Sequence, residues 1–278
     1  MPITEERWTT ARAAVATTAE RFLDLVAASD PRTMATAHWS VADTVAHVGT
    51  IAFMDTDIVR SAEPAFPSAR EQFLTATVDT VSDLNATTLR LVTVRDPVVL
   101  ADRLRQDVDD ILLATESVDP ATPVSWLGGS RVPVCGVLAH LVNELNIHGR
   151  DIARATRTPW TVPPADAALF FEVFFVELLR HGVGHLIDND EPPRERRIAV
   201  GFRSHHTTPV TVVLHRGRVS LDEWDSPADA RIFFDPPAFN LMMFHRIGKA
   251  RAALTGKVRV WGPRPWLLPT FLKTVRCP

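Results

Sequence analysis

Three polar side chains recur at four-residue steps in the segment 140–148. His140, Glu144 and His148 lie on one face of any helix that covers this segment, because four residues make about one turn. A carboxylate and an imidazole four residues apart on a helix can bind one metal ion, in the way that HExxH places its pair. The residues between them are mostly apolar, so we expect one flank of this helix to be buried.

A metal ion held by Glu144 and His148 needs a further ligand from elsewhere in the chain. His47 is the natural candidate, because it lies in the apolar helical segment 45–49, where an exposed polar residue is not expected. Nitrogen and oxygen donors without a thiolate suit zinc, with nickel, cobalt and iron as competitors. Three protein ligands leave one position open for water or substrate, as in catalytic zinc sites.

Two aspartates and a further histidine are candidates for supporting roles. Asp43 lies one turn before the first histidine ligand and Asp151 three residues after the last, so each could hold an outer imidazole nitrogen. His140 precedes Glu144 by one turn and could be a fourth ligand, a proton carrier or a core histidine. Of these three interpretations the core histidine is favoured.

Spacing alone does not establish a metal site. A histidine on a helix face is more often an ordinary hydrogen-bonded residue, and the E-x-x-x-H pattern is common by chance. A glutamate among apolar neighbours shifts the balance, because a buried carboxylate needs a partner. The sequence has no G-x-S-x-G, P-loop or Rossmann glycine pattern, so serine hydrolase and nucleotide-binding functions have no support.

The elements that must position these residues are predicted to be helical up to about residue 160. Thr4 is expected to cap a first helix, and Ser40 with Asp43 resembles a capping box that opens a second. Further helices are expected from 68 into the eighties, over 98–117 and over 133–156. The proline- and glycine-rich segment 119–131 is expected to be a loop.

The second half begins with a predicted helix over 164–181, after which the apolar period shifts towards two. Strands are expected over 197–203, 211–215, 219–224, 230–234 and 257–261, with helices over 238–254 and 266–275. The predicted fold class is therefore α plus α+β: a helical bundle over 1–160 and a small antiparallel-sheet α+β domain over 161–278.

Composition is that of an ordinary globular protein. The 278 residues are 46% apolar and 23% charged with a net charge of −3, which gives no basic field for nucleic acid. Glu5 and Glu6 stand where a signal peptide needs basic residues, and no apolar run reaches membrane-span length, so we expect a cytoplasmic protein. Cys135 is expected to be buried and Cys277 exposed, which gives protein-thiol chemistry little support.

Two motifs resemble those of a known family. The segment 38–48 contains W-S-V-A-D-T-V-A-H and resembles the W-[ST]-V-x-D-x-x-x-H motif of the mycothiol-dependent maleylpyruvate isomerase family, a branch of the DinB-like metalloproteins. The segment 144–153, E-L-N-I-H-G-R-D-I-A, is similar to that family's E-x-x-x-H-G-x-D-[LI]-A. The segments 230–236 and 254–258 are similar to its small C-terminal domain, which is related to sterol-carrier folds.

The resemblance implies a DinB-like four-helix bundle in which His47, Glu144 and His148 bind zinc. It further implies that the metal binds the thiol of mycothiol, which would then act as a thiolate in isomerisation or S-transfer on a small electrophile. Two other hypotheses stay open at this stage. One is a non-catalytic small-ligand or lipid binding protein with a structural or vestigial metal site, and the other is metal-assisted hydrolysis.

Three basic residues of the second half are candidates for contacts with substrate or thiol: Arg246, Lys257 and Arg264. For each of these residues, an ordinary solvated charge on the surface is the more common role. Many family members carry Gly-Arg where this chain has Gly256-Lys257, and a lysine lacks the bidentate geometry of an arginine. The substrate and the oligomeric state are not predicted.

Overall fold

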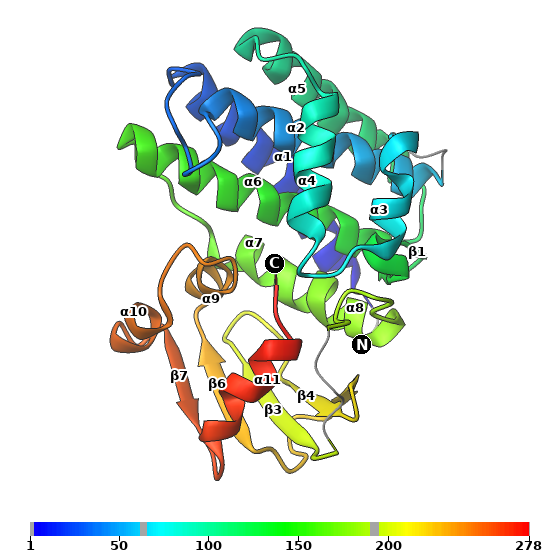
Figure 1. The fold of residues 1–278 in the computed structure, drawn as a ribbon, viewed down its shortest axis with the longest axis vertical. Helices are drawn as coiled ribbons and strands as arrows, with labels where there is room; N and C mark the ends of the chain where they lie inside the picture. The colour runs from blue at the N-terminus through cyan, green and yellow to red at the C-terminus, as the bar shows by residue number, and fades with distance from the viewer. Residues whose placement is uncertain (1–2, 62–65, 190–194, 278) are drawn as a thin grey trace.

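The computed structural model describes residues 3–61, 66–189 and 195–277. Helices make up the first half of the chain, and a five-stranded sheet with covering helices makes up the second (Figure 1). This is the predicted fold class. The sequence alone placed a domain boundary after residue 160, and that boundary stays a prediction.

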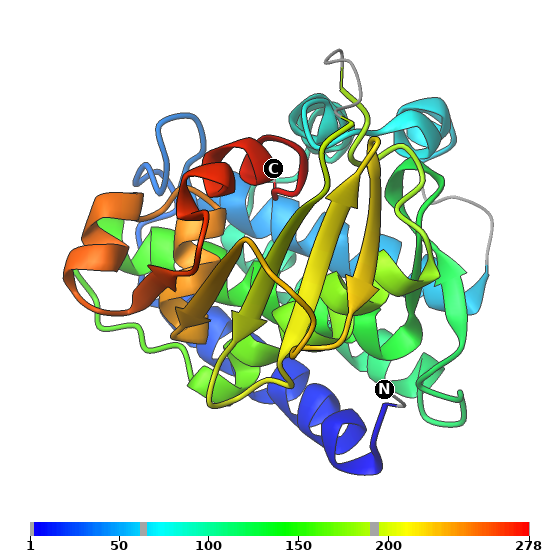
Figure 2. The same cartoon turned by 90° about the horizontal axis from the view of Figure 1, so that it is seen from below.

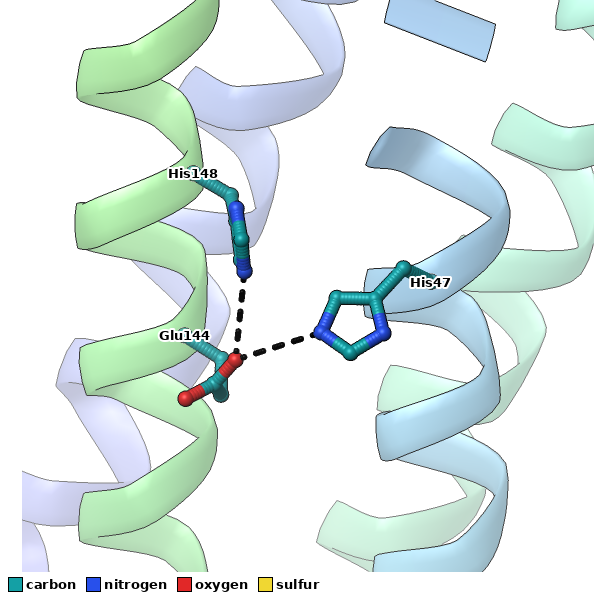
Figure 3. Close-up of side chains that lie close together, drawn as sticks. All are labelled: His47, Glu144 and His148. Carbon is teal, nitrogen blue, oxygen red and sulfur yellow. Dashed lines mark ion pairs between the residues drawn. The ribbon is translucent and has the colours of Figure 1, made fainter. Parts of the chain in front are cut away.

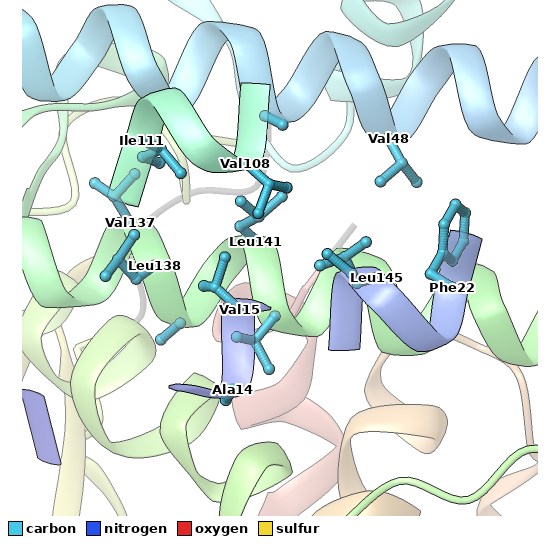
Figure 4. Packing of buried hydrophobic residues seen from close by; sticks show 14 of the residues in the cluster. Ala14, Val15, Phe22, Val48, Val108, Ile111, Val137, Leu138, Leu141 and Leu145 are labelled. Carbon is cyan, nitrogen blue, oxygen red and sulfur yellow. The ribbon is translucent and has the colours of Figure 1, made fainter. Parts of the chain in front are cut away.

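Four long helices form the bundle of the first half: α1 (Glu5–Ala27), α2 (Val41–Arg60), α5 (Pro97–Ala114) and α6 (Val134–Thr156). Helix α2 packs on α5 and α6, and α1 packs on the same two helices. Their apolar stripes meet in one core, in which Phe22, Leu141 and Leu145 are fully buried (Figure 4).

The starts of these helices follow the local sequence. Thr4 caps α1 by accepting a hydrogen bond from the amide of Arg7, and Asp96 caps α5 ahead of Pro97. At the start of α2, Ser40 Oγ accepts from the amide of Asp43, and the Asp43 carboxylate accepts from the amide of Ser40. This reciprocal capping box fixes where α2 begins, and so where His47 projects from it.

The segment between α2 and α5 differs from the single predicted helix. A short turn over Pro67–Ala69 leads into α3 (Arg70–Thr75), and α4 (Val81–Leu91) follows after a break. The expected loop over 119–131 contains β1 (Pro123–Ser125) and ends where β2 (Arg131–Pro133) begins, and these two short strands form an antiparallel hairpin. Gly128 and Gly129, both at positive φ, make its turn and allow these short strands to pair.

A continuous helical run links the two halves. Helix α7 (Pro164–Leu169) passes through one π-helical segment, Phe170–Phe175, into α8 (Val176–His181). Phe170 and Phe174 belong to the bundle core, whereas Phe171 belongs to the core of the sheet. The apolar residues of this run therefore serve two cores, and for this reason they do not form a single apolar stripe.

The sheet has the strand order β5-β4-β3-β6-β7. Its strands are β3 (Ile198–Arg203), β4 (Val210–His215), β5 (Arg218–Asp222), β6 (Ala230–Phe234) and β7 (Val258–Trp261). All five strands lie close to the ranges predicted from the sequence. The sheet is mixed and not wholly antiparallel, because the chain crosses over from β5 to place β6 parallel to β3.

One face of the sheet packs towards the bundle, and the other looks outward in Figure 2. Phe202 of the inner face contacts Phe171 of the linking run and Phe271 of α11 (Leu268–Thr274). Helices α9 (Pro236–Met243) and α10 (Lys249–Leu254) complete this half. Within the described residues, no helix combines the length and the apolar character that crossing a membrane requires.

Candidate metal centre

Helices α2 and α6 bring three potential ligands together across the bundle (Figure 3). Glu144 Oε2 lies 3.4 Å from His148 Nε2 on the same helix and 3.6 Å from His47 Nε2 on the facing helix. One ligand atom from each of the three residues lies within 4.8 Å of the other two. One carboxylate oxygen thus faces two imidazole nitrogens, a geometry that a single cation between them would satisfy.

The cluster is buried at the centre of the bundle. His47 is 3% exposed and His148 is 5% exposed. The Trp39 indole covers both imidazoles, with ring centroids 4.6 Å from His47 and 5.8 Å from His148. The tryptophan of the W-S-V motif therefore covers one side of the two imidazoles.

Burial and mutual contacts set the protonation of these groups. Burial alone would raise the pKa of Glu144, but the imidazoles of His148 and His47 outweigh it and hold that pKa well below its ordinary value. Burial lowers the pKa of His47, and the neighbouring Glu144 only partly opposes this. An ionised carboxylate beside a neutral imidazole is the state of these two residues that binds a metal ion.

A second buried pair continues the cluster on its other side. His140 Nε2 lies 3.6 Å from Glu144 Oε1, and His140 Nδ1 lies 3.5 Å from Asp55 Oδ2. The two oxygens of Glu144 therefore face different partners: Oε2 faces the candidate ligands, and Oε1 faces His140. The sequence indicates His140 as a candidate but not Asp55, whose signal is a carboxylate directly after the apolar segment 51–54 of α2.

Asp151 and Arg246 connect the site to the second half of the chain. Asp151 Oδ2 lies 3.5 Å from Nδ1 of His148, three residues earlier on α6. The same oxygen accepts a hydrogen bond of 2.7 Å from Arg246 Nη2. Burial alone would lower the pKa of His148, but Asp151 and Glu144 outweigh it and raise that pKa. Arg246 therefore contacts the site through Asp151.

Asp43 does not hold the outer nitrogen of His47, contrary to the sequence interpretation. Its carboxylate is engaged by Ser40 in the capping box and by Arg95, whose Nε lies 2.7 Å from Oδ1. His47 Nδ1 is buried without a hydrogen-bond partner among the described residues. Because the Asp43 carboxylate caps the start of α2, it does not turn towards His47.

Lys257 and Arg264 form ion pairs within the second half. Lys257 Nζ lies 3.2 Å from Asp235 Oδ2, and Arg264 pairs with Asp229. Among the described residues that line the cavity at the metal centre, neither is found. Their proposed contact with substrate has no support in this arrangement, because both charges already have carboxylate partners next to the sheet.

A cavity of about 140 Å³ opens beside the site. His47, Glu144, His140 and Asp55 line one part of it, and most of the remaining wall is apolar. Cys277 also lines the cavity and is 7% exposed, so the expectation that this terminal residue is exposed was wrong. The chain leaves α11 towards the bundle and buries the thiol, and this burial raises the pKa of Cys277 to about 12.

Comparisons with known proteins place this geometry in context. The family described as "Mycothiol maleylpyruvate isomerase N-terminal domain" matches residues 11–153, just over half of the chain. That range contains His47, Glu144 and His148. No curated protein matches the sequence.

Two solved structures are similar to the chain: a mycothiol-dependent maleylpyruvate isomerase and a histidine-to-alanine mutant of it. Each is 16% identical, and each alignment covers 87% of this chain and 88% of the other. The TM-scores are 0.46 for the first and 0.45 for the mutant.

Proposed function

The chain belongs to the mycothiol maleylpyruvate isomerase N-terminal domain family, and from this premise we propose that it is a metal-dependent enzyme that uses mycothiol or a similar small thiol. The reaction is isomerisation or S-transfer on a small electrophile. The metal is a divalent cation, with zinc the best match to the donor set. His47, Glu144 and His148 are its ligands in this proposal.

One observation carries the proposal: donor atoms from two helices converge within 4.8 Å in a buried place. A bare carboxylate among imidazoles is a costly arrangement to bury, and a cation between them offsets that cost. Two nitrogens and one oxygen, with no thiolate among them, suit zinc and leave a coordination position open. The side of the cluster that faces the cavity is where that position would lie.

The residues of the chain have separate roles in this proposal. A divalent cation bound here would lower the pKa of a coordinated thiol, so that the sulfur is a thiolate at neutral pH. Glu144 and the two imidazoles hold that cation, and Trp39 excludes water on the side away from the cavity. The apolar cavity walls hold the electrophile close to the sulfur, so that the two reactants meet in a fixed orientation.

A second candidate function is non-catalytic binding of an apolar ligand, with a metal that is only structural. The cavity favours it, because its lining would hold such a ligand whether or not a reaction follows. Metal-assisted hydrolysis is a further alternative, in which the open position keeps water. These alternatives differ from the first in whether a small thiol is needed for turnover.

Metal content is the first experiment. Purified wild type, Glu144→Ala and Glu177→Ala are exposed to zinc, dialysed and measured by inductively coupled plasma mass spectrometry. Glu177 is a matched control, because it too is buried in an E-x-x-x-H pair, with Oε2 at 3.5 Å from His181 Nε2. We expect about one equivalent of zinc in wild type and in Glu177→Ala, and a loss in Glu144→Ala. A metal-free wild type would overturn the proposal.

Thiol dependence is the second experiment. Wild type and His47→Ala are incubated with a panel of electrophiles, with and without mycothiol, and the free thiol and the products are followed. We expect turnover by wild type only when the thiol is present, and none by His47→Ala. Turnover without thiol would favour hydrolysis, whereas ligand binding that survives His47→Ala without turnover would favour the binding protein.

A further inference from the structure

The cavity beside the metal centre follows one face of α2. His47, Ile51, Met54 and Ile58 line it at steps of three and four residues, so they form one stripe along the helix. From His47 to Ile58 the helix rises about 16 Å at about 1.5 Å per residue. The metal centre is therefore at one end of the stripe, and the other end lies about three turns away.

The walls that face this stripe are mostly apolar. Phe170 and Phe174 come from the π-helical segment, Trp126 comes from the hairpin region, and Leu84 comes from α4. Phe170 and Phe174 stack on each other with ring centroids 5.0 Å apart, and Trp126 meets Phe174 edge-on at 5.6 Å. Aromatic rings from two separate parts of the chain thus form a wall suited to a flat, apolar group.

Charge is concentrated at the metal centre and beside the middle of the stripe. Glu144 lies at the metal centre, Asp55 lies about two turns further along α2 than His47, and His140 lies between the two carboxylates. Among the described residues that line the cavity, the one arginine or lysine is Arg276, and its Nη2 is paired with Asp79 Oδ1 at 2.5 Å. Past the metal centre, a negatively charged group would meet the Asp55 carboxylate and its partner His140, then apolar side chains, and no arginine or lysine without a carboxylate partner among the described lining residues.

Burial of such a charge without a partner is strongly unfavourable. A substrate with one carboxylate could direct it to the metal end, but a second carboxylate would lie among leucine and phenylalanine side chains. An uncharged ring has no such cost and gains from the apolar lining. Its size also fits, because the volume of about 140 Å³ is close to the roughly 150 Å³ of an apolar cavity that binds benzene.

We propose that the electrophile of this site carries an uncharged, apolar group about the size of a benzene ring, and not a second carboxylate. The ring lies between the Ile51–Ile58 stripe of α2 and the Phe170–Phe174 wall. The reactive carbon lies at the metal end, beside His47 and Glu144. That placement rests on the proposed function, whereas the preference of the cavity for an uncharged ring does not.

Three probes that share one ring test this preference. Toluene, benzoate and phthalate carry no charge, one negative charge and two, and their binding to zinc-treated and to zinc-free protein is measured by ligand-observed NMR titration. We expect toluene to bind both forms and phthalate to bind on the order of tenfold more weakly or not at all. Tighter binding of phthalate than of toluene would overturn the inference.

Variants of the wall locate the bound probe. Leu84, which is 3% exposed, lines the cavity, so Leu84→Phe should fill it and weaken toluene binding. The exposed Leu113, which does not line the cavity, provides Leu113→Phe as the matched control. If Leu84→Phe does not fold, Leu84→Ala enlarges the cavity instead, and naphthalene should then bind better than it does to wild type. Toluene binding that no folded Leu84 variant changes would overturn the inference.

Failure of this inference can be told apart from failure of the proposed function. A protein that takes up no zinc but binds toluene in a Leu84-dependent way would support the cavity preference and overturn the enzyme proposal. A protein that takes up zinc and converts an electrophile only with thiol, but binds phthalate more tightly than toluene, would support the enzyme proposal and overturn the cavity preference.

Discussion

Arg246 and Asp151 form an ion pair in which Nη2 lies 2.7 Å from Oδ2, and a second hydrogen bond of 3.2 Å runs from Nε to the same oxygen. Arg246 follows α9 in the second half of the chain, and Asp151 belongs to α6 of the bundle. Because Asp151 Oδ2 also lies 3.5 Å from His148 Nδ1, the pair links the second half to a candidate metal ligand.

Loss of this pair should weaken metal binding. In Arg246→Ala, Asp151 loses its cationic partner and is free to rotate away from His148, so the imidazole is oriented less well. We expect zinc affinity to fall by about 10- to 100-fold, the usual effect of removing an outer partner of a metal ligand. Competition titration against a chromophoric chelator measures it. Lys257→Ala, which breaks an ion pair elsewhere in the same half, is the control, and equal affinities in the two variants would contradict the prediction.

Asp55 should influence the metal centre through His140. The Asp55 carboxylate faces His140 Nδ1, and His140 Nε2 faces the outer oxygen of Glu144. In Asp55→Asn the imidazole loses its anionic partner, so we expect about a tenfold loss of zinc affinity and a change in the ¹⁵N shifts of the His140 ring. Asp57→Asn, at a half-buried position on the same helix, is the control. Unchanged His140 shifts in Asp55→Asn would show that the two residues do not interact.

Much of the site follows from local sequence. Glu144 and His148 face the same way because a helix repeats every 3.6 residues, and the W-S-V-x-D-x-x-x-H motif indicates His47 as the residue to bring beside them. The capping box at Ser40 and the proline start of α5 are likewise readable without a structure. Each of these features depends on residues within a few positions of one another.

The features that the sequence did not predict depend on contacts between residues that are far apart in the chain. Arg246 contacts Asp151 from 95 positions away, and no periodic pattern reveals such a pair. The sequence around Asp55 indicates no special role, because its partner His140 belongs to another helix. Cys277 was expected to be exposed because it stands near the end of the chain, yet the tail turns into the cavity. The π-helical segment arises where one helical run packs against two cores at once.

Asp107 should make stability fall as pH rises. Burial raises the pKa of Asp107, and the neighbouring Asp110 adds to this, giving a value of about 7 against 3.8 for an ordinary aspartate. Between these pH values the folded chain holds a proton that the unfolded chain has lost. The free energy of unfolding contributed by this residue therefore decreases from pH 4 to pH 7.

Urea unfolding over this pH range tests the prediction. Asp107→Asn removes the titrating group, so its free energy of unfolding should depend less on pH than that of wild type, with the largest gain near neutral pH. Asp109→Asn, at an exposed position on the same helix, should follow wild type. Parallel pH profiles for wild type and Asp107→Asn would show that this carboxyl group is not perturbed by folding.

Replacement of Gly149 by alanine should destabilise the protein, because Trp160, which lies outside α6, packs against this position. A Cβ atom at this position would overlap the ring of Trp160, at Cζ2 above all. Trp160 is held in place, because its Nε1 donates to the carbonyl of Asn146 at 3.1 Å and Arg21 stacks on its ring. The glycine that follows His148 in the second motif is therefore explained by the approach of an indole to α6.

The matched variant is Gly49→Ala on α2, where an added Cβ would meet no atom within 4 Å. Alanine is a better helix former than glycine, so Gly49→Ala should stabilise the protein by about 0.5–1 kcal/mol. Gly149→Ala gains the same helix preference but must displace Trp160, and overpacking of this kind costs about 1–3 kcal/mol. Urea unfolding should therefore show a higher free energy of unfolding for Gly49→Ala and a lower one for Gly149→Ala. A stabilised Gly149→Ala would mean that Trp160 moves aside without cost.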